Sequence, residues 1–194
     1  MQMARESLKG KWGLAVGTFL VYLIVIGALQ GVAVIYSISS ILSILIAGPM
    51  ALGIATFSLS LSRNQDARLE QIWQGFNNFG TSLGAYLLMM LFIILWTLLL
   101  IIPGIIAALS YSMTFYILAD DSSIGAMQAI DKSKMMMDGY KWKYFCLGLR
   151  FLGWALLCVL TLGIGFLWLM PYMQVSMAKF YDDVKANQTI TETI

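Results

Sequence analysis

The sequence predicts an all-α protein, a polytopic membrane bundle of six spans arranged as three hairpins, within a single domain over residues 1–194. Composition is the first reason, because 60% of the residues are hydrophobic, 11% are charged and the mean hydropathy is +0.81. A soluble domain needs a largely polar surface, which this composition cannot supply. The second reason is that long charge-free stretches follow one another at lengths that suit pairs of membrane helices.

The first charge-free stretch lies between Lys11 and Arg63 and contains 51 residues. As one helix it would be about 75 Å long at about 1.5 Å per residue, whereas the core of a bilayer is about 30 Å thick. The stretch therefore predicts two spans, at 14–35 and 40–61.

A second charge-free stretch, of 49 residues, lies between Glu70 and Asp120. Pro103-Gly104 stands near the middle of its most apolar part. A proline alone would suggest only a kink, because membrane helices tolerate proline. The apolar part is nevertheless long enough for two spans, so we predict 82–102 and 104–119 with Pro103-Gly104 as the turn.

The third apolar stretch, residues 144–178, is interrupted by Arg150. It fits one long tilted helix if Arg150 marks the membrane edge, or two helices that turn at Leu160–Gly165 if the arginine reaches the surface from inside a span. A weak repeat favours two helices, because a glycine followed by aromatic residues precedes each apolar block, at intervals of 65 and 64 residues. The glycines are Gly10, Gly75 and Gly139, and the predicted spans are 144–162 and 165–181.

The distribution of charge predicts the orientation. The turns near Tyr36–Ser40, Ile101–Ile105 and Leu160–Gly165 carry no charge, and every charged residue except Arg150 lies toward the opposite ends of the spans. Because basic residues concentrate on the cytoplasmic side of membrane proteins, we expect both termini to be cytoplasmic.

Two connections on the predicted cytoplasmic side have amphipathic patterns and are expected to form short in-plane helices. In residues 64–80, apolar side chains recur at steps of three and four, so this segment would lie in the headgroup plane or pack as a cap beneath the bundle. In residues 119–145, Asp120 and Asp121 are of the types that cap helix N-termini, and Gly139 is expected to end the helix that follows. The apolar positions of the first connection are Leu69, Ile72, Trp73, Phe76 and Phe79.

Several motifs follow one another along nearly the whole chain: "GPMALG" (48–53), "IIPGI" (101–105), "YSMTFYILADD" (111–121), "SKMMMDGYKWKYF" (133–145), "LTLGIGFLWLMPY" (160–172) and "FYDD" (180–183). In this order they resemble the domain-of-unknown-function 975 family of predicted bacterial integral membrane proteins. The resemblance implies a bacterial plasma membrane protein with several spans. It implies no activity and no catalytic residues.

Five residues are candidates for function. Arg150 stands inside a predicted span, where a charge is costly, so it either anchors its helix by reaching cytoplasmic phosphates or lies on a substrate or ion pathway. Gln30 and Gln174 also lie within predicted spans and would line such a pathway with Arg150. Asp120 and Asp121 fit helix capping at the cytoplasmic end of the fourth span.

Other kinds of chemistry are not indicated. The chain has no histidine, the commonest general base and a frequent metal ligand. We therefore predict no catalytic, cofactor-binding or metal site and no enzymatic activity. The net charge is only +2 and the basic residues are scattered, which argues against nucleic acid as a partner.

Two functions remain open at this point. The first is a non-enzymatic accessory or scaffold protein that binds membrane partners or lipids through its cytoplasmic side. The second is a small transporter or efflux component for a lipid-like or amphipathic substrate. The expected partners are the lipid bilayer and either another membrane protein or further copies of this chain.

Overall fold

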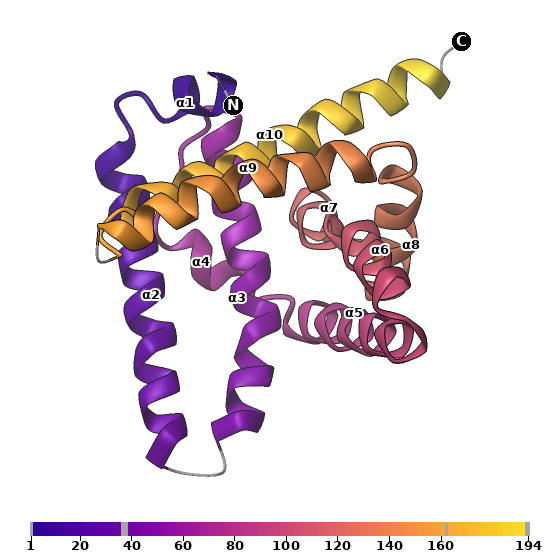
Figure 1. Cartoon of the computed structure of the whole chain (residues 1–194), viewed down its shortest axis with the longest axis horizontal. Coiled ribbons are helices and arrows are strands. Elements are labelled where there is room, and N and C mark those ends of the chain that lie inside the picture. The colour runs from indigo at the N-terminus through magenta and orange to yellow at the C-terminus, as the bar shows by residue number, and fades with distance from the viewer. Residues whose placement is uncertain (1, 36–38, 162, 193–194) are drawn as a thin grey trace.

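The computed structural model describes residues 2–35, 39–161 and 163–192. Within these residues the chain forms helices and no strand, which confirms the predicted all-α class. In chain order the helices are α1 (Gln2–Ser7), α2 (Trp12–Ile35), α3 (Ser39–Ser62), α4 (Gln71–Gln74), α5 (Phe79–Leu99), α6 (Ile101–Tyr111), α7 (Thr114–Asp120), α8 (Ala126–Met136), α9 (Lys141–Leu160) and α10 (Phe166–Glu192) (Figure 1).

Helix α3 is the centre of the assembly and packs against α2, α4, α5, α7 and α10. Glycines on and beside it allow unusually close approach. A Cβ atom at Gly53 would lie 1.9 Å from the carbonyl oxygen of Ile72, and a Cβ at Gly75 would lie 1.9 Å from that of Pro49. Two stretches of backbone therefore pack directly on each other here, and no larger residue fits.

The connection between α3 and α5 packs along α3. Only the single turn α4 is helical, and its Ile72 is buried whereas Trp73 is 45% exposed. The contacts of Ile72 and Gly75 with α3 favour packing against the bundle, the second of the two expected arrangements, over a helix lying free in the headgroup plane.

The turn between α5 and α6 lies at Leu100, three residues before the predicted position. Leu100 is extended, with φ −162° and ψ 143°, and Pro103 stands in the first turn of α6. Proline is tolerated there because that turn has no intrahelical acceptor for its N–H. Gly104 allows α6 to approach α5, since a Cβ would lie 2.1 Å from Thr97 Oγ1.

The predicted span 104–119 is interrupted between α6 and α7, around Ser112. Ser133 of α8 satisfies the backbone at this break, because its Oγ accepts a hydrogen bond from Met113 N at 3.1 Å and donates one to the carbonyl of Ser110 at 2.8 Å. A break among buried residues is tolerated when its polar groups find such partners.

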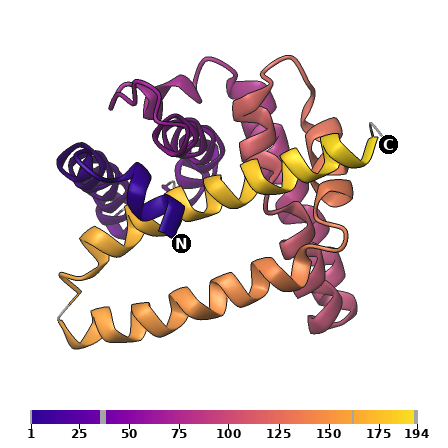
Figure 2. The same cartoon turned by 90° about the horizontal axis from the view of Figure 1, so that it is seen from above.

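Residues 141–192 form two helices rather than one, joined at the predicted turn. However, α10 packs against α1 and α2, and Gly165 in the turn lines a cavity together with Arg5 and Trp12. The turn therefore lies beside the start of α2, whereas the six-span arrangement placed it at the opposite side of the membrane. Figures 1 and 2 show α9 and α10 running across the direction of α2 and α3.

Four stretches of the described chain are long and apolar enough to cross a membrane. The α5–α6 hairpin also points away from the direction of α2 and α3 in Figures 1 and 2. Six spans arranged as three hairpins are therefore not confirmed. The four stretches are Ser43–Ser62, Phe79–Leu99, Ile101–Asp120 and Lys141–Leu160.

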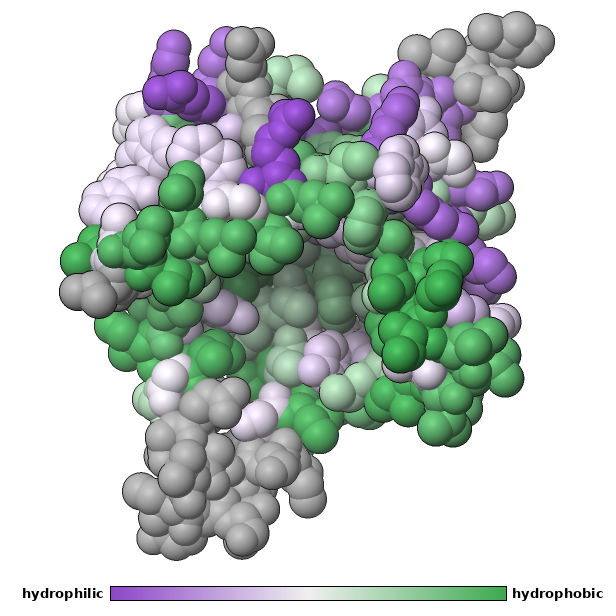
Figure 3. All heavy atoms as spheres, viewed as in Figure 1, coloured by the Kyte–Doolittle hydropathy of each residue, from purple (hydrophilic) through white to green (hydrophobic). Residues whose placement is uncertain are grey.

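Large apolar side chains are exposed over two regions, the tip of the α5–α6 hairpin and the outer face of α9. At the tip, Leu98 is 83% exposed and its neighbours through Ile102 are also exposed. Figure 3 shows these regions in green, with hydrophilic residues gathered along the upper rim of the molecule. Water would not tolerate an apolar surface of this extent, so the folded chain suits a lipid environment.

Replacement of Gly53 by alanine is expected to destabilise the fold by about 1–3 kcal/mol, because the new Cβ must displace the backbone at Ile72. The measurement is the thermal unfolding midpoint of the purified protein in mild detergent. Gly17→Ala is the matched control, since a Cβ at Gly17 in α2 meets nothing within 4 Å. Equal midpoints for the two variants would contradict the packing described for α3.

Candidate functional site

A cluster of charged side chains joins α3, α7 and α10 at the polar end of α3. Arg63, directly after α3, pairs with Asp120 of α7 at 2.6 Å and with Asp182 of α10 at 2.8 Å. Asp182 also accepts a hydrogen bond from the Ser62 hydroxyl at 3.1 Å. One guanidinium therefore ties together three segments that lie far apart in the sequence, a role suited to its several fixed donors.

Asp120 is the most buried charge of this cluster, with its side chain 11% exposed. Its second carboxylate oxygen accepts a hydrogen bond from the Tyr181 hydroxyl at 3.0 Å and contacts the Lys185 ammonium group. Arg63 and Lys185 thus balance Asp120 and Asp182, which allows the charges to be partly buried.

The protonation of Arg63 follows from these contacts. Partial burial lowers the pKa of Arg63, but the hydrogen bonds and charges of Asp120 and Asp182 outweigh it and raise that pKa above its ordinary value. The guanidinium therefore stays charged at any physiological pH. The cluster is therefore suited to hold helices together rather than to relay protons. We call Arg63, Asp120, Asp182, Tyr181 and Lys185 the clamp.

Of the predicted candidates, Asp120 belongs to the clamp. Gln174 lies eight residues before Asp182 on α10, and its Oε1 accepts a hydrogen bond from Tyr116 of α7 at 3.0 Å. Asp121 instead closes a local turn, accepting hydrogen bonds from the Ser123 N–H and hydroxyl. Capping of the following helix by these acids is not observed, because the N-cap of α8 is Gly125.

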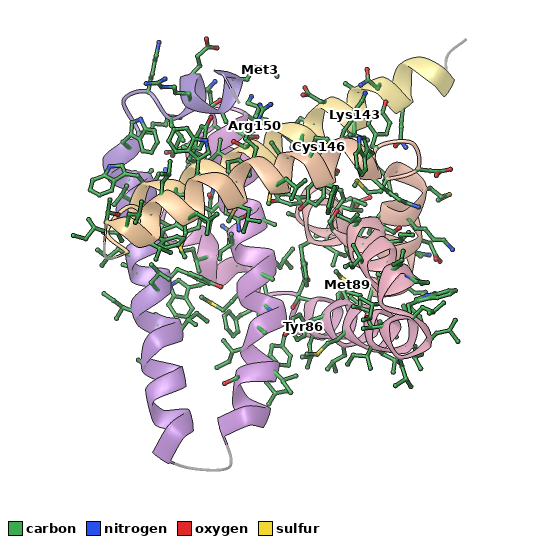
Figure 4. The ribbon with its side chains drawn as sticks, viewed as in Figure 1. Met3, Tyr86, Met89, Lys143, Cys146 and Arg150 are labelled. Atoms are coloured by element: carbon green, nitrogen blue, oxygen red, sulfur yellow. The ribbon has the colours of Figure 1, made fainter. Side chains whose placement is uncertain are left out.

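The remaining candidates, Arg150 and Gln30, lie elsewhere. Arg150 is exposed near the middle of α9, on the same helix as Lys143 and Cys146 (Figure 4). Gln30 belongs to α2, but its side chain lies outside the described part of the structure. Gln174 of α10 is thus bonded to Tyr116 of α7, and Arg150 is exposed on α9. The two residues belong to helices that pack on each other, as the contact of Phe151 with Tyr172 shows.

The sequence missed most of the clamp. The sequence pattern indicates Arg63 and Asp182 only as charges at the ends of spans, because Arg63 is 57 residues from Asp120 and 119 residues from Asp182. The feature of the sequence that could have indicated the clamp is the pair of acids in "FYDD", because the first of them, Asp182, pairs with Arg63.

A cavity of about 450 Å³ lies between the N-terminal segment and the α9–α10 hairpin. Leu169 and Cys158 are buried at its walls, whereas Trp154, Trp168 and Arg5 are exposed. Its volume is in the range of small-molecule sites, and its lining is mainly apolar and aromatic. The lining residues are Arg5, Trp12, Trp154, Cys158, Gly165, Trp168, Leu169 and Tyr172.

Two further cavities lie at the charged end of the molecule, between α8, α9 and α10. The first, of about 460 Å³, is lined by residues that include Lys143 and Asp183. The second, of about 560 Å³, includes Lys132 and Asp138. Both cavities present charges of both signs, and the second also includes the exposed side chain of Met135. They offer surface for a polar partner.

Comparison with known proteins gives one match. A family model described as "Protein of unknown function (DUF975)" matches residues 1–103 and 97–188. Searches of curated proteins and of solved structures found no match.

The substitution Asp120→Asn is expected to lower the free energy of unfolding by about 1–3 kcal/mol, because it removes the charge that Arg63, Lys185 and Tyr181 all contact. The unfolding midpoint in mild detergent measures this change. Asp66→Asn is the control, since the Arg68–Asp66 pair is exposed by 66% and 73% and is worth about 0–1 kcal/mol. Similar losses in both variants would contradict the role assigned to the clamp.

Proposed function

The chain belongs to the DUF975 family of unknown function, and from this premise we propose that it is a non-enzymatic accessory or scaffold protein of the bacterial plasma membrane. In this proposal it crosses the membrane several times and binds lipids or membrane partners, with both termini in the cytoplasm. The observation that carries the proposal is the separation of its surfaces. Apolar side chains cover α5, α6 and α9, while the charged cavities gather at one end.

The polar groups near the helix ends support a binding role over transport. Asp120 and Asp182 are neutralised inside the clamp, and Gln174 is bonded to Tyr116. A transporter or efflux component for a lipid-like substrate would need polar groups that share a pathway, as was expected for Arg150, Gln30 and Gln174. The accessory role is supported by the contacts between helices that already engage Asp120, Asp182 and Gln174.

The proposal includes a specific topology for the last two helices. Although α9 is long and apolar enough to cross a membrane, we infer that the α9–α10 hairpin lies along the cytoplasmic surface, because its turn lines a cavity with Arg5 and Trp12 at the start of α2. In-plane helices carry one apolar face and polar or basic residues elsewhere. On α9, Leu149, Leu152 and Leu156 are exposed apolar residues, and Lys141 and Lys143 supply positive charge.

Labelling of an introduced cysteine distinguishes the in-plane α9–α10 hairpin from the six-span topology. In a variant with Cys146 and Cys158 changed to serine, Ile164→Cys at the α9–α10 turn is expected to resist a membrane-impermeant thiol reagent in intact cells. It should react in inside-out vesicles, because Ile164 is exposed in the turn. Labelling of this cysteine from outside would place the turn across the membrane and contradict the in-plane hairpin.

Two controls accompany this labelling experiment. Asp66→Cys, in the charged connection after α3, should react only in inside-out vesicles. Ser37→Cys, at the turn that the sequence places outside, should react in intact cells.

The accessory role is tested by reconstitution of the purified protein into liposomes. We expect lipid flux between leaflets, followed with a fluorescent phospholipid, to equal that of protein-free liposomes. In native mass spectrometry, the same preparation should retain bound lipid or form complexes with itself. Flux that rises in proportion to the protein content would favour the transport alternative and contradict the proposal.

A further inference from the structure

We propose that the aromatic cavity between α1, α2 and the α9–α10 hairpin holds one anionic phospholipid. Its phosphate would lie at Arg5, and the first part of an acyl chain would lie among the tryptophans. This inference rests on the proposed function, since it names the class of lipid and the place where it binds. The cavity combines one cation with a mainly apolar lining, as an amphipathic anion requires.

Tryptophans from three helices converge at this cavity. Trp12 begins α2, Trp154 lies in α9 and Trp168 lies in α10. Indole rings favour the depth of lipid headgroups, because they present an apolar body together with an N–H donor. Such a site binds the region of a lipid where the headgroup meets the acyl chain. On the left of Figure 3, residues of intermediate hydropathy lie between the hydrophilic upper rim and the apolar band.

Arg5 supplies the charge recognition. It is the charged residue of the cavity lining, its side chain is exposed, and within the described residues no carboxylate forms an ion pair with it. A guanidinium binds phosphate through paired donors with a geometry that an ammonium group cannot match. Lys9 and Lys11 follow on the same segment, which contains one acid, Glu6, so the segment carries a net positive charge. The inner leaflet of a plasma membrane is anionic, which matches this charge.

The shape of the site indicates a lipid rather than a free phosphate. Leu169 and Cys158 form apolar walls that a phosphate ion would leave uncovered. The exposed side chains Leu156 and Leu157 continue this apolar surface along α9. An acyl chain can pass from the cavity onto that surface and into the bilayer without crossing a polar barrier.

The test titrates the full-length protein in mild detergent with three probes, read by native mass spectrometry. The probes are phosphatidylglycerol, phosphatidylcholine with the same acyl chains, and glycerol phosphate. We expect one phosphatidylglycerol to bind about tenfold or more tightly than phosphatidylcholine, as charge-assisted hydrogen bonds permit. Glycerol phosphate should bind far more weakly. Equal binding of the two lipids would overturn the inference, and so would glycerol phosphate binding as tightly as phosphatidylglycerol.

Two variants test whether Arg5 causes the preference for phosphatidylglycerol over phosphatidylcholine. Arg5→Gln should abolish this preference. Lys9→Gln removes one positive charge from the same segment and should leave the preference unchanged. Trp168→Ala should weaken the binding of both lipids several-fold without changing the ratio of their affinities. An equal loss of preference in the Arg5 and Lys9 variants would show that the net charge of the segment, and not Arg5 itself, attracts the anionic lipid. That result would overturn the inference.

A measurement on the wild-type protein does not depend on the folding of any variant. Three of the six tryptophans line the cavity, so phosphatidylglycerol with brominated acyl chains should quench indole fluorescence more than brominated phosphatidylcholine does. Equal quenching would again overturn the inference. Lipid binding without preference would contradict only the proposed lipid site. Lipid flux in the liposome assay would contradict the accessory role instead.

Discussion

The close contact between α3 and the backbone that follows it is the constraint on which the rest of the structure depends. At Gly53 and Gly75, carbonyl oxygens occupy the space that a Cβ would need. At Gly48, a Cβ would similarly lie 2.7 Å from the carbonyl oxygen of Ser82. As a result α5 begins beside the middle of α3, about three to four turns from the polar end at Ser62 by helix rise. The α5–α6 hairpin then extends from that depth, with its apolar tip exposed.

The charged clamp fixes the other end of the same helix. Because Arg63 holds Asp120 and Asp182, the end of α7 and the second half of α10 must both meet the end of α3. The first half of α10 is thereby directed past α1 and α2, and α9 follows it along the side of the molecule. The aromatic cavity is a consequence of this route, since it brings Trp154 and Trp168 to the start of α2.

The two constraints also explain why the surfaces of the molecule separate. Arg63, Asp120 and Asp182 pair with one another in the clamp. Other charged residues of α8, α9 and α10, such as Lys132, Lys143 and Asp183, line the cavities at the rim. The intervening helices present mainly apolar side chains outward. A protein with these surfaces is suited to hold lipids or membrane partners at the boundary between headgroups and acyl chains, which is where the proposed lipid site lies.

The sequence by itself determined the helical class and the family, because long apolar stretches and the order of motifs are local properties. It placed the helix before Gly139 well, where a φ of 75° ends that segment. It also gave Asp120 as a candidate, although as a cap. Only the tertiary structure decided that Asp120 meets Arg63 and Asp182, and that the α9–α10 turn lies beside Arg5. The physical reason is that both results depend on directions of packing set by backbone contacts and ion pairs between distant residues, which hydropathy and spacing along the chain do not encode.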